Sequence, residues 1–183
     1  MNAEEYAEHW DRNKIWLHYR MPRHQKRFRT IASALRGGEG RTFADIGCVF
    51  GHSTHKLKAL VGGEWMGIDF SELAIARARE AFPAIDFRFI ENIDGLRHLP
   101  QFDGVVCSEV IEHLEDDALL VEGLVAMTRR VLVVTTPCVA VKSVNHLRLY
   151  DEKSLAELFG EYSGIRIAKA PPFFYAVMRK PNA

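Results

Sequence analysis

Two acidic residues, Asp45 and Asp69, are 24 positions apart, and each lies near the end of a short apolar run, where a turn begins. Two residues after Asp45, Gly47 allows a tight turn and close approach of the backbone to a ligand, and Gly51 lets the next helix pack tightly. The carboxylate of Asp45 can hold an ammonium group. It distinguishes this turn from a pyrophosphate cradle, which prefers backbone N–H groups without a nearby anion. Asp69 stands where an acid typically accepts hydrogen bonds from ribose hydroxyls, and Phe70 can lie against a purine.

A group of acids and histidines follows the fourth apolar run. If the Glu109-x-x-Glu112-His113 segment is helical, its three polar residues share one face. Two carboxylates and an imidazole suit a divalent cation, and His146 can join them if the loop after Pro137 folds back over the sheet. Without a metal, His113 or His146 is the natural general base.

A scaffold of alternating strands and helices is expected to position these residues. The expected strands are Thr42–Ile46, Glu64–Asp69, Asp86–Ile90, Gly104–Cys107, Arg130–Thr135, Ile165–Ala168 and Phe173–Met178. The expected helices are 3–20, Pro22–Leu35, Ser53–Val61, one from the cap Ser71 to Phe82, one after the fourth strand to Met127, and one from the cap Asp151 to Gly160. This order predicts an α/β fold with a doubly wound, mostly parallel seven-stranded sheet. Pro171-Pro172 leaves no room for a crossover, so the last two strands should form an antiparallel edge hairpin.

The composition is that of an ordinary globular domain. Of the 183 residues, 48% are hydrophobic and 26% are charged, and the 24 Lys and Arg equal the 24 Asp and Glu. This balance argues against a large non-specific field for nucleic acid and leaves room for a local basic patch. No apolar run is long enough to span a bilayer, and the acidic N-terminus does not look like a secretory signal, so a cytoplasmic location without membrane contact is expected. The three widely spaced cysteines are expected to be reduced thiols.

Taken in order, these segments resemble the motifs of class I methyltransferases that use S-adenosylmethionine (SAM), over roughly residues 40–160. An Asp-x-Gly-Cys-x-x-Gly turn is weak evidence alone, but here Gly-Ile-Asp-Phe-Ser and Phe-Asp-Gly-Val-Val-Cys-Ser-Glu-Val-Ile-Glu-His-Leu follow it. The resemblance implies a cofactor-binding set in which the first turn takes the methionine side of SAM, the second strand end its ribose, the third its adenine, and the fourth faces the cofactor. The members of this set are Asp45, Gly47, Cys48, Gly51, Asp69, Phe70, Asn92, Ile93 and Ser108.

The resemblance also implies a division of the chain and an activity. Residues 1–38 are expected to form a helical lid, and 39–183 the Rossmann-like SAM-binding domain of the class I methyltransferase fold. We expect methyl transfer from SAM to a small-molecule acceptor, with a hydroxyl favoured. Val49 replaces the middle glycine of the family's first turn, where it resists a positive φ and adds bulk beside the cofactor.

The expected metal ligands Glu109, Glu112, His113 and His146 resemble those of two metal-using branches. One is the ubiquinone-pathway O-methyltransferases, and the other is the small-RNA 3′-terminal 2′-O-methyltransferases. Both act on a hydroxyl beside a second hydroxyl, which a metal can chelate. In many metal-free relatives the same Glu-His-Leu motif positions the loop, so both interpretations stay open.

Three alternatives to a small-molecule methyltransferase remain at this point. A nicotinamide-dependent oxidoreductase would prefer three glycines in the first turn and no acid at Asp45. A non-catalytic SAM-binding module would keep Asp45 and Asp69 without a usable acceptor side. An RNA-end methyltransferase would use the acid–histidine cluster and the basic stretch 20–29, which holds five basic side chains and no acid. For that stretch we expect a solvated helix face, balanced by acids such as Glu4 and Glu8.

Overall fold

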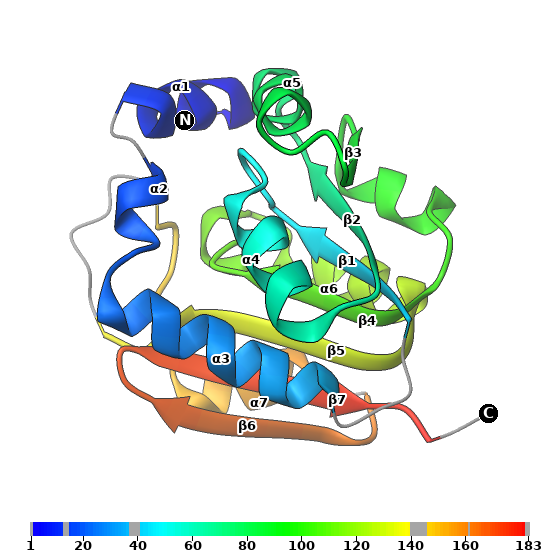
Figure 1. The fold of residues 1–183 in the computed structure, drawn as a ribbon. Coiled ribbons are helices and arrows are strands. Elements are labelled where there is room, and N and C mark those ends of the chain that lie inside the picture. The colour runs from blue at the N-terminus through cyan, green and yellow to red at the C-terminus, as the bar shows by residue number, and fades with distance from the viewer. Residues whose placement is uncertain (1, 13–14, 37–40, 140–145, 161, 182–183) are drawn as a thin grey trace.

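The computed structural model describes residues 2–12, 15–36, 41–139, 146–160 and 162–181. Its centre is a seven-stranded sheet in the order β3-β2-β1-β4-β5-β7-β6 (Figure 1). The strands are β1 (Thr42–Ile46), β2 (Glu64–Asp69), β3 (Asp86–Phe89), β4 (Phe102–Ser108), β5 (Thr128–Pro137), β6 (Ile165–Ala170) and β7 (Phe173–Arg179). The first five strands pair in parallel, whereas β7 pairs antiparallel with both β5 and β6. The predicted mostly parallel sheet with an antiparallel edge hairpin is confirmed.

Helices cover both faces of the sheet. The helices α3 (Pro22–Arg36), α4 (His52–Val61) and α5 (Glu72–Ala81) lie in front of the sheet in Figure 1. Behind it lie α6 (Asp117–Met127) and α7 (Glu152–Leu158). The 3₁₀ turn η1 (Ile93–His98) packs against α6. Two short N-terminal helices, α1 (Ala3–Arg12) and α2 (Ile15–His18), complete the chain, and α1 packs on α5.

Each sheet face buries its own hydrophobic core. Ile46, Ile68 and Leu132 belong to the core on the α6 side, and Phe28 and Phe87 belong to the core on the α3 side. Strands buried on both faces read as continuous apolar runs rather than as alternating ones. This is why the central strands could be recognised from the sequence. Their parallel pairing places their carboxyl ends along one edge of the sheet.

Two expected helices are wrong in extent. In place of one helix over 3–20, the described residues form α1 and α2, with residues 13–14 outside the described part. The chain after β4 is not α-helical, because Glu109 has a φ of +62° and only the single 3₁₀ turn η2 (Ile111–His113) precedes α6. By contrast, the predicted caps are confirmed, since Ser71 and Asp151 accept hydrogen bonds from the first turns of α5 and α7. No helix among the described residues is long and apolar enough to cross a membrane.

Candidate functional site

The turn between β1 and α4 has a left-handed backbone at three positions. Gly47 and Gly51 have φ values of +75° and +74°. A Cβ at Gly47 would lie 2.3 Å from the Val110 side chain, and one at Gly51 would lie 2.5 Å from the Phe87 ring, so both positions require glycine. Val49 also has a positive φ, +47°, which is strained for a β-branched residue. The turn therefore imposes on Val49 the positive φ that a β-branched side chain resists.

Asp69 holds this turn in place from the end of β2. Its Oδ2 accepts a hydrogen bond of 2.8 Å from the Val49 N–H, and its Oδ1 accepts one of 3.1 Å from the Ser71 N–H. The carboxylate is largely buried, and desolvation raises its pKa to about 6 despite these hydrogen bonds. A carboxylate oxygen can accept more than one hydrogen bond, so Asp69 can bind hydroxyl groups while it fixes the turn.

Asp45 lies deeper than Asp69. Its Oδ2 accepts hydrogen bonds of 2.7 Å from the hydroxyls of Ser53 and Thr54 in the first turn of α4. Only 2% of the residue is exposed, and burial raises the pKa of the carboxyl to about 6. Cys48, which the resemblance places in the cofactor-binding set, is fully buried in this structure. Asp45 therefore braces α4 as well as contributing negative charge beneath the turn.

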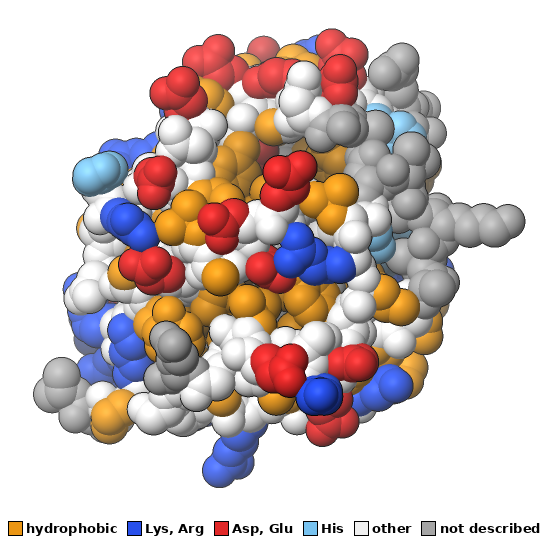
Figure 2. Space-filling view, turned by 180° about the vertical axis from the view of Figure 1, so that it is seen from behind, with side chains coloured by type: hydrophobic (Ala, Val, Ile, Leu, Met, Phe, Trp, Pro, Cys, Tyr) orange, Lys and Arg blue, Asp and Glu red, His pale blue; other side chains and the backbone are white. Residues whose placement is uncertain are grey.

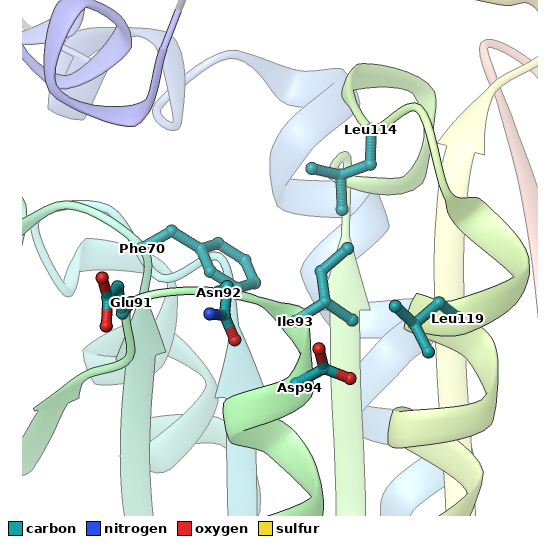
Figure 3. Close-up of a pocket in the computed structure, with 7 residues that line it drawn as sticks. All are labelled: Phe70, Glu91, Asn92, Ile93, Asp94, Leu114 and Leu119. Carbon is teal, nitrogen blue, oxygen red and sulfur yellow. The ribbon is translucent and has the colours of Figure 1, made fainter.

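A cavity of about 330 Å³ opens beside Phe70, past the ends of β2 and β3. It is lined by Phe70, Glu91, Asn92, Ile93, Asp94, Leu114 and Leu119. Figure 3 shows the Phe70 ring on one side and Ile93, Leu114 and Leu119 on the other. The structure thus brings together the predicted residues Phe70, Asn92 and Ile93 in a mostly apolar slot.

Leu119 is a cavity residue that sequence reasoning missed. It lies in the first turn of α6, and the expected helix after β4 did not distinguish residues that line a cavity from residues of the core. Ser108, predicted to face the cofactor, lies half-buried at the end of β4, where its hydroxyl is 2.8 Å from the hydroxyl of Thr135.

Glu112, His113 and His146 form a compact cluster at the same edge. One ligand atom from each lies within 4.8 Å of the others. The Glu112 carboxylate is 1% exposed, and its Oε2 accepts a 3.0 Å hydrogen bond from Thr136. Its Oε1 is buried and has no hydrogen-bond partner among the described residues. His146 Nε2 lies 4.0 Å from that oxygen. A buried carboxylate oxygen without a donor is costly, and a divalent cation would satisfy it.

His146 lies in the cluster because the segment that contains it packs against η2. The backbone N–H of Leu147 donates a 2.8 Å hydrogen bond to the carbonyl of Glu112, which fixes the segment after the loop against η2. Residues 140–145 of that loop lie outside the described part of the chain. Glu109 is not a member of the cluster, so the expectation that it shares a helical face with Glu112 and His113 and converges with them is wrong.

The expectation that the basic stretch 20–29 forms a solvated helix face is wrong in part, because His24 and Arg27 are buried. Arg27 Nη1 lies 3.1 Å from Glu109 Oε2. Nor does Glu4 balance these cations. Its carboxylate accepts hydrogen bonds of 2.7 Å from the Ser71 hydroxyl and 2.6 Å from the Glu72 N–H at the start of α5.

The N-terminal helix α1 contacts the cluster through one aromatic side chain. The ring of Tyr6 in α1 contacts the ring of His113, with 5.3 Å between their centroids. His113 also contacts His146, with a centroid distance of 4.8 Å. The cluster is thus bordered by the Tyr6 ring, which comes from the part of the chain that precedes the sheet.

The comparison with protein families matches a methyltransferase domain over residues 44–131. Among curated proteins, the chain is similar to the ubiquinone biosynthesis O-methyltransferase of Pseudomonas paraeruginosa, with 36% identity over 92 residues. That match covers 48% of this chain and 39% of the relative, so the chain matches about two fifths of the relative's length.

The comparison with solved structures finds the same fold. A SAM-dependent methyltransferase from Archaeoglobus fulgidus superposes with a TM-score of 0.70 at 18% identity, over 85% of this chain and 92% of that one. A small RNA methyltransferase, HEN1, superposes with a TM-score of 0.69 at 17% identity, over 87% of this chain and 25% of that one. At these identities the superpositions establish the fold and leave the acceptor open.

Proposed function

We propose that this chain, which resembles the class I SAM-dependent methyltransferases, transfers the methyl group of SAM to a hydroxyl of a small-molecule acceptor. The observation that carries this proposal is the position of three features along one edge of the sheet. Asp69 and the cavity beside Phe70 offer a nucleoside site, and the Glu112–His113–His146 cluster lies next to it. Ligands bind at this edge in doubly wound folds.

The residues of the turn and the cavity fit SAM. We infer that Asp69 accepts hydrogen bonds from the ribose hydroxyls, and that the adenine lies between Phe70 and the apolar side chains of Ile93 and Leu119. Asn92 offers its amide at the rim of that cavity. The negative charge of Asp45 beneath the turn favours the amino group of the methionine part. SAM supplies an activated methyl group, so the protein's task is to hold the acceptor in line and to exclude water.

A hydroxyl acceptor must also lose its proton. We propose that Glu112, His113 and His146 bind a divalent cation, for which the orphaned Glu112 Oε1 provides the structural argument. A mixed carboxylate and imidazole set favours Mn, Fe, Co or Zn over Ca. When bound, such a cation lowers the pKa of a coordinated hydroxyl. Burial lowers the pKa of His146, so its imidazole is neutral near pH 7, the form that can bind a cation. In a metal-free protein the same neutral imidazole would instead accept the hydroxyl proton.

We further propose that residues 1–38 act as a lid over the acceptor. Tyr6 contacts His113, and Glu4 anchors α1 to the first turn of α5. Water must be kept from the reacting groups, and aromatic side chains above the cluster can do this.

A specific observation supports a second candidate, methylation of an RNA end. A groove of about 560 Å³ between α3 and the β6–β7 hairpin is lined by Lys26, Arg29, Arg166 and Arg179, with no acidic side chain in its lining. The face opposite α3 carries many acidic side chains among hydrophobic ones (Figure 2). A phosphate backbone would therefore approach along α3. An activity screen that offers catechols, other vicinal diols and a single-stranded RNA with a free 2′,3′-diol, with and without chelator, separates the two candidates.

The cofactor assignment is tested by calorimetric titration with SAM and NAD. We expect SAM to bind and NAD to give no detectable heat at concentrations that saturate the protein with SAM. The reason is that the charge of Asp45 beneath the turn repels a pyrophosphate. Displacement of bound S-adenosylhomocysteine by NAD would instead support an oxidoreductase.

SAM binding is expected to weaken as the pH falls through about 6. The pKa of Asp69 is raised to about 6 in the ligand-free protein, so its carboxylate is ionised above that pH and protonated below it. A protonated carboxyl is the weaker acceptor for hydroxyl groups. The same burial acts on stability in the opposite direction, because an ionised buried carboxylate disfavours folding as the pH rises from 3.8 to about 6. Calorimetry from pH 5 to pH 8 on wild type and Asp69→Asn checks this. The variant should show a smaller pH dependence than wild type, and what remains is expected from Asp45, whose pKa is also raised to about 6. An equal dependence in both proteins would assign the titration to another group.

A further inference from the structure

Arg27 is a buried cation near the acid–histidine cluster. It lies in α3 with 2% of its surface exposed, and its guanidinium is 4.8 Å from the centre of the Phe173 ring and 5.4 Å from that of Phe28. A buried charge is costly unless it is paired. Among the described residues, the ion pair that compensates Arg27 is the one with Glu109, in which Nη1 and Oε2 are 3.1 Å apart.

Glu109 is held on the Arg27 side by both of its carboxylate oxygens. Oε2 faces Arg27, and Oε1 accepts a 3.2 Å hydrogen bond from the hydroxyl of Thr135. The backbone of Glu109 is fixed as well, because its N–H donates a 2.9 Å hydrogen bond to the carbonyl of Thr135 and its φ is +62°. A non-glycine residue in this strained conformation persists only where its surroundings hold it.

The Glu109 carboxylate thus stays out of a site that its sequence position would let it enter. It precedes Glu112 by three residues, yet among the described residues the cluster within 4.8 Å contains Glu112, His113 and His146 and not Glu109. We propose that Arg27 is a positioning residue that holds Glu109 away from this cluster and thereby limits the affinity of the cluster for a divalent cation. This inference rests on the proposed metal site and concerns the number of its ligands.

A carboxylate oxygen paired with a guanidinium is a poor ligand for a second cation. Removal of Arg27 would free Glu109 as a fourth ligand and would also remove a positive charge that repels the metal. Methionine is the matched replacement, because it keeps an unbranched stem between Phe28 and Phe173 without the charge. Lysine at position 27 keeps the charge and the pairing with Glu109.

The test is a Co²⁺ titration followed by the visible absorption of the bound ion. The proteins are wild type, Arg27→Met, Arg27→Lys and the double variant Arg27→Met/Glu109→Gln. We expect Arg27→Met to bind Co²⁺ about tenfold or more tightly than wild type, a gain of ~1.4 kcal/mol. Arg27→Lys should resemble wild type, and the double variant should lose the gain. The absorption envelope of Arg27→Met should differ from that of wild type because the ligand set changes.

The outcomes separate this inference from the metal site itself. If wild type binds Co²⁺ and a folded Arg27→Met binds it no more tightly, or if the double variant keeps the gain, Arg27 does not restrain Glu109. If neither wild type nor any variant binds Co²⁺, the metal site is wrong, and the inference with it. If Arg27→Met does not fold, Glu109→Gln alone decides. An unchanged Co²⁺ spectrum supports exclusion of Glu109 from the wild-type site, and a changed spectrum overturns it.

Discussion

Replacing Asp69 by alanine is expected to weaken SAM binding by about 10- to 100-fold while the sheet remains folded. Losing a hydrogen bond to a charged group costs ~1.5–3 kcal/mol. Asp69 contributes in two ways, because its carboxylate is the proposed acceptor for the ribose hydroxyls and also fixes the Val49 and Ser71 amides of the turn. Calorimetric titration with SAM measures the change, and far-ultraviolet circular dichroism checks the fold.

Asp69→Asn is the matched control for this experiment. The amide keeps one oxygen that can accept from the Val49 N–H, but it cannot accept at both oxygens as a carboxylate does. We therefore expect an intermediate dissociation constant for SAM. An Asp69→Ala protein that folds and binds SAM as tightly as wild type would remove Asp69 from the cofactor site.

Metal uptake is expected to be lost when Glu112 or His113 is replaced. Chelator-washed wild type, reloaded with Mn²⁺ or Co²⁺, should retain close to one equivalent by elemental analysis, and Glu112→Gln or His113→Ala should retain none. The physical reason is that Glu112 Oε1, the orphaned buried oxygen of the cluster, is the oxygen expected to bind the cation. Glu115→Gln is the control, since it makes the same exchange at an exposed side chain close in sequence.

The substitution Glu112→Gln is also expected to stabilise the metal-free protein. Burial and the nearby charge of Glu109 raise the pKa of Glu112 well above its ordinary value, so an ionised Glu112 is unfavourable in the metal-free protein. Metal-free Glu112→Gln should therefore melt at a higher temperature than metal-free wild type near neutral pH. Wild type that takes up no stoichiometric metal, or a His113→Ala protein that takes up as much, would contradict the site and return His113 to the role of a base or a loop-positioning residue.

The sheet could be predicted from the sequence because its strands are short apolar runs bounded by turns. The strand Glu64–Asp69 and the cap Ser71 illustrate this, since both were predicted at their observed positions. Because parallel strands end along one edge, the residues that follow those strands could be placed near one another from the sequence. Phe70, Asn92 and Ile93 do line one cavity.

The segment after β4 shows where this reasoning stops. Glu109, Glu112 and His113 have the spacing of a helical face, but spacing does not report the φ of Glu109, which turns the chain out of the helix. The outcome depends on tertiary contacts, namely the hydrogen bond from the Glu109 N–H to Thr135 and the ion pair with Arg27. Neither contact lies within the local pattern.

The burial of Arg27 was missed because the residue lies in a run of basic side chains, although the sequence does indicate it. It stands four residues before Ile31 and eight before Leu35, so it lies on the buried face of α3 beside Phe28. A cation on an apolar helical stripe indicates a buried pair rather than a solvated face. Its partner could not be named from sequence, because Glu109 is 82 residues away and reaches Arg27 only through the strand order.

A crystal structure of the protein with S-adenosylhomocysteine tests the central claim most directly. We expect the adenine in the cavity between Phe70 and Leu119, the ribose hydroxyls within hydrogen-bond distance of Asp69, and the sulfur directed toward the Glu112–His113–His146 cluster. A ligand bound elsewhere, or an adenine outside this cavity with Asp69 free of the ribose, would contradict the proposed site.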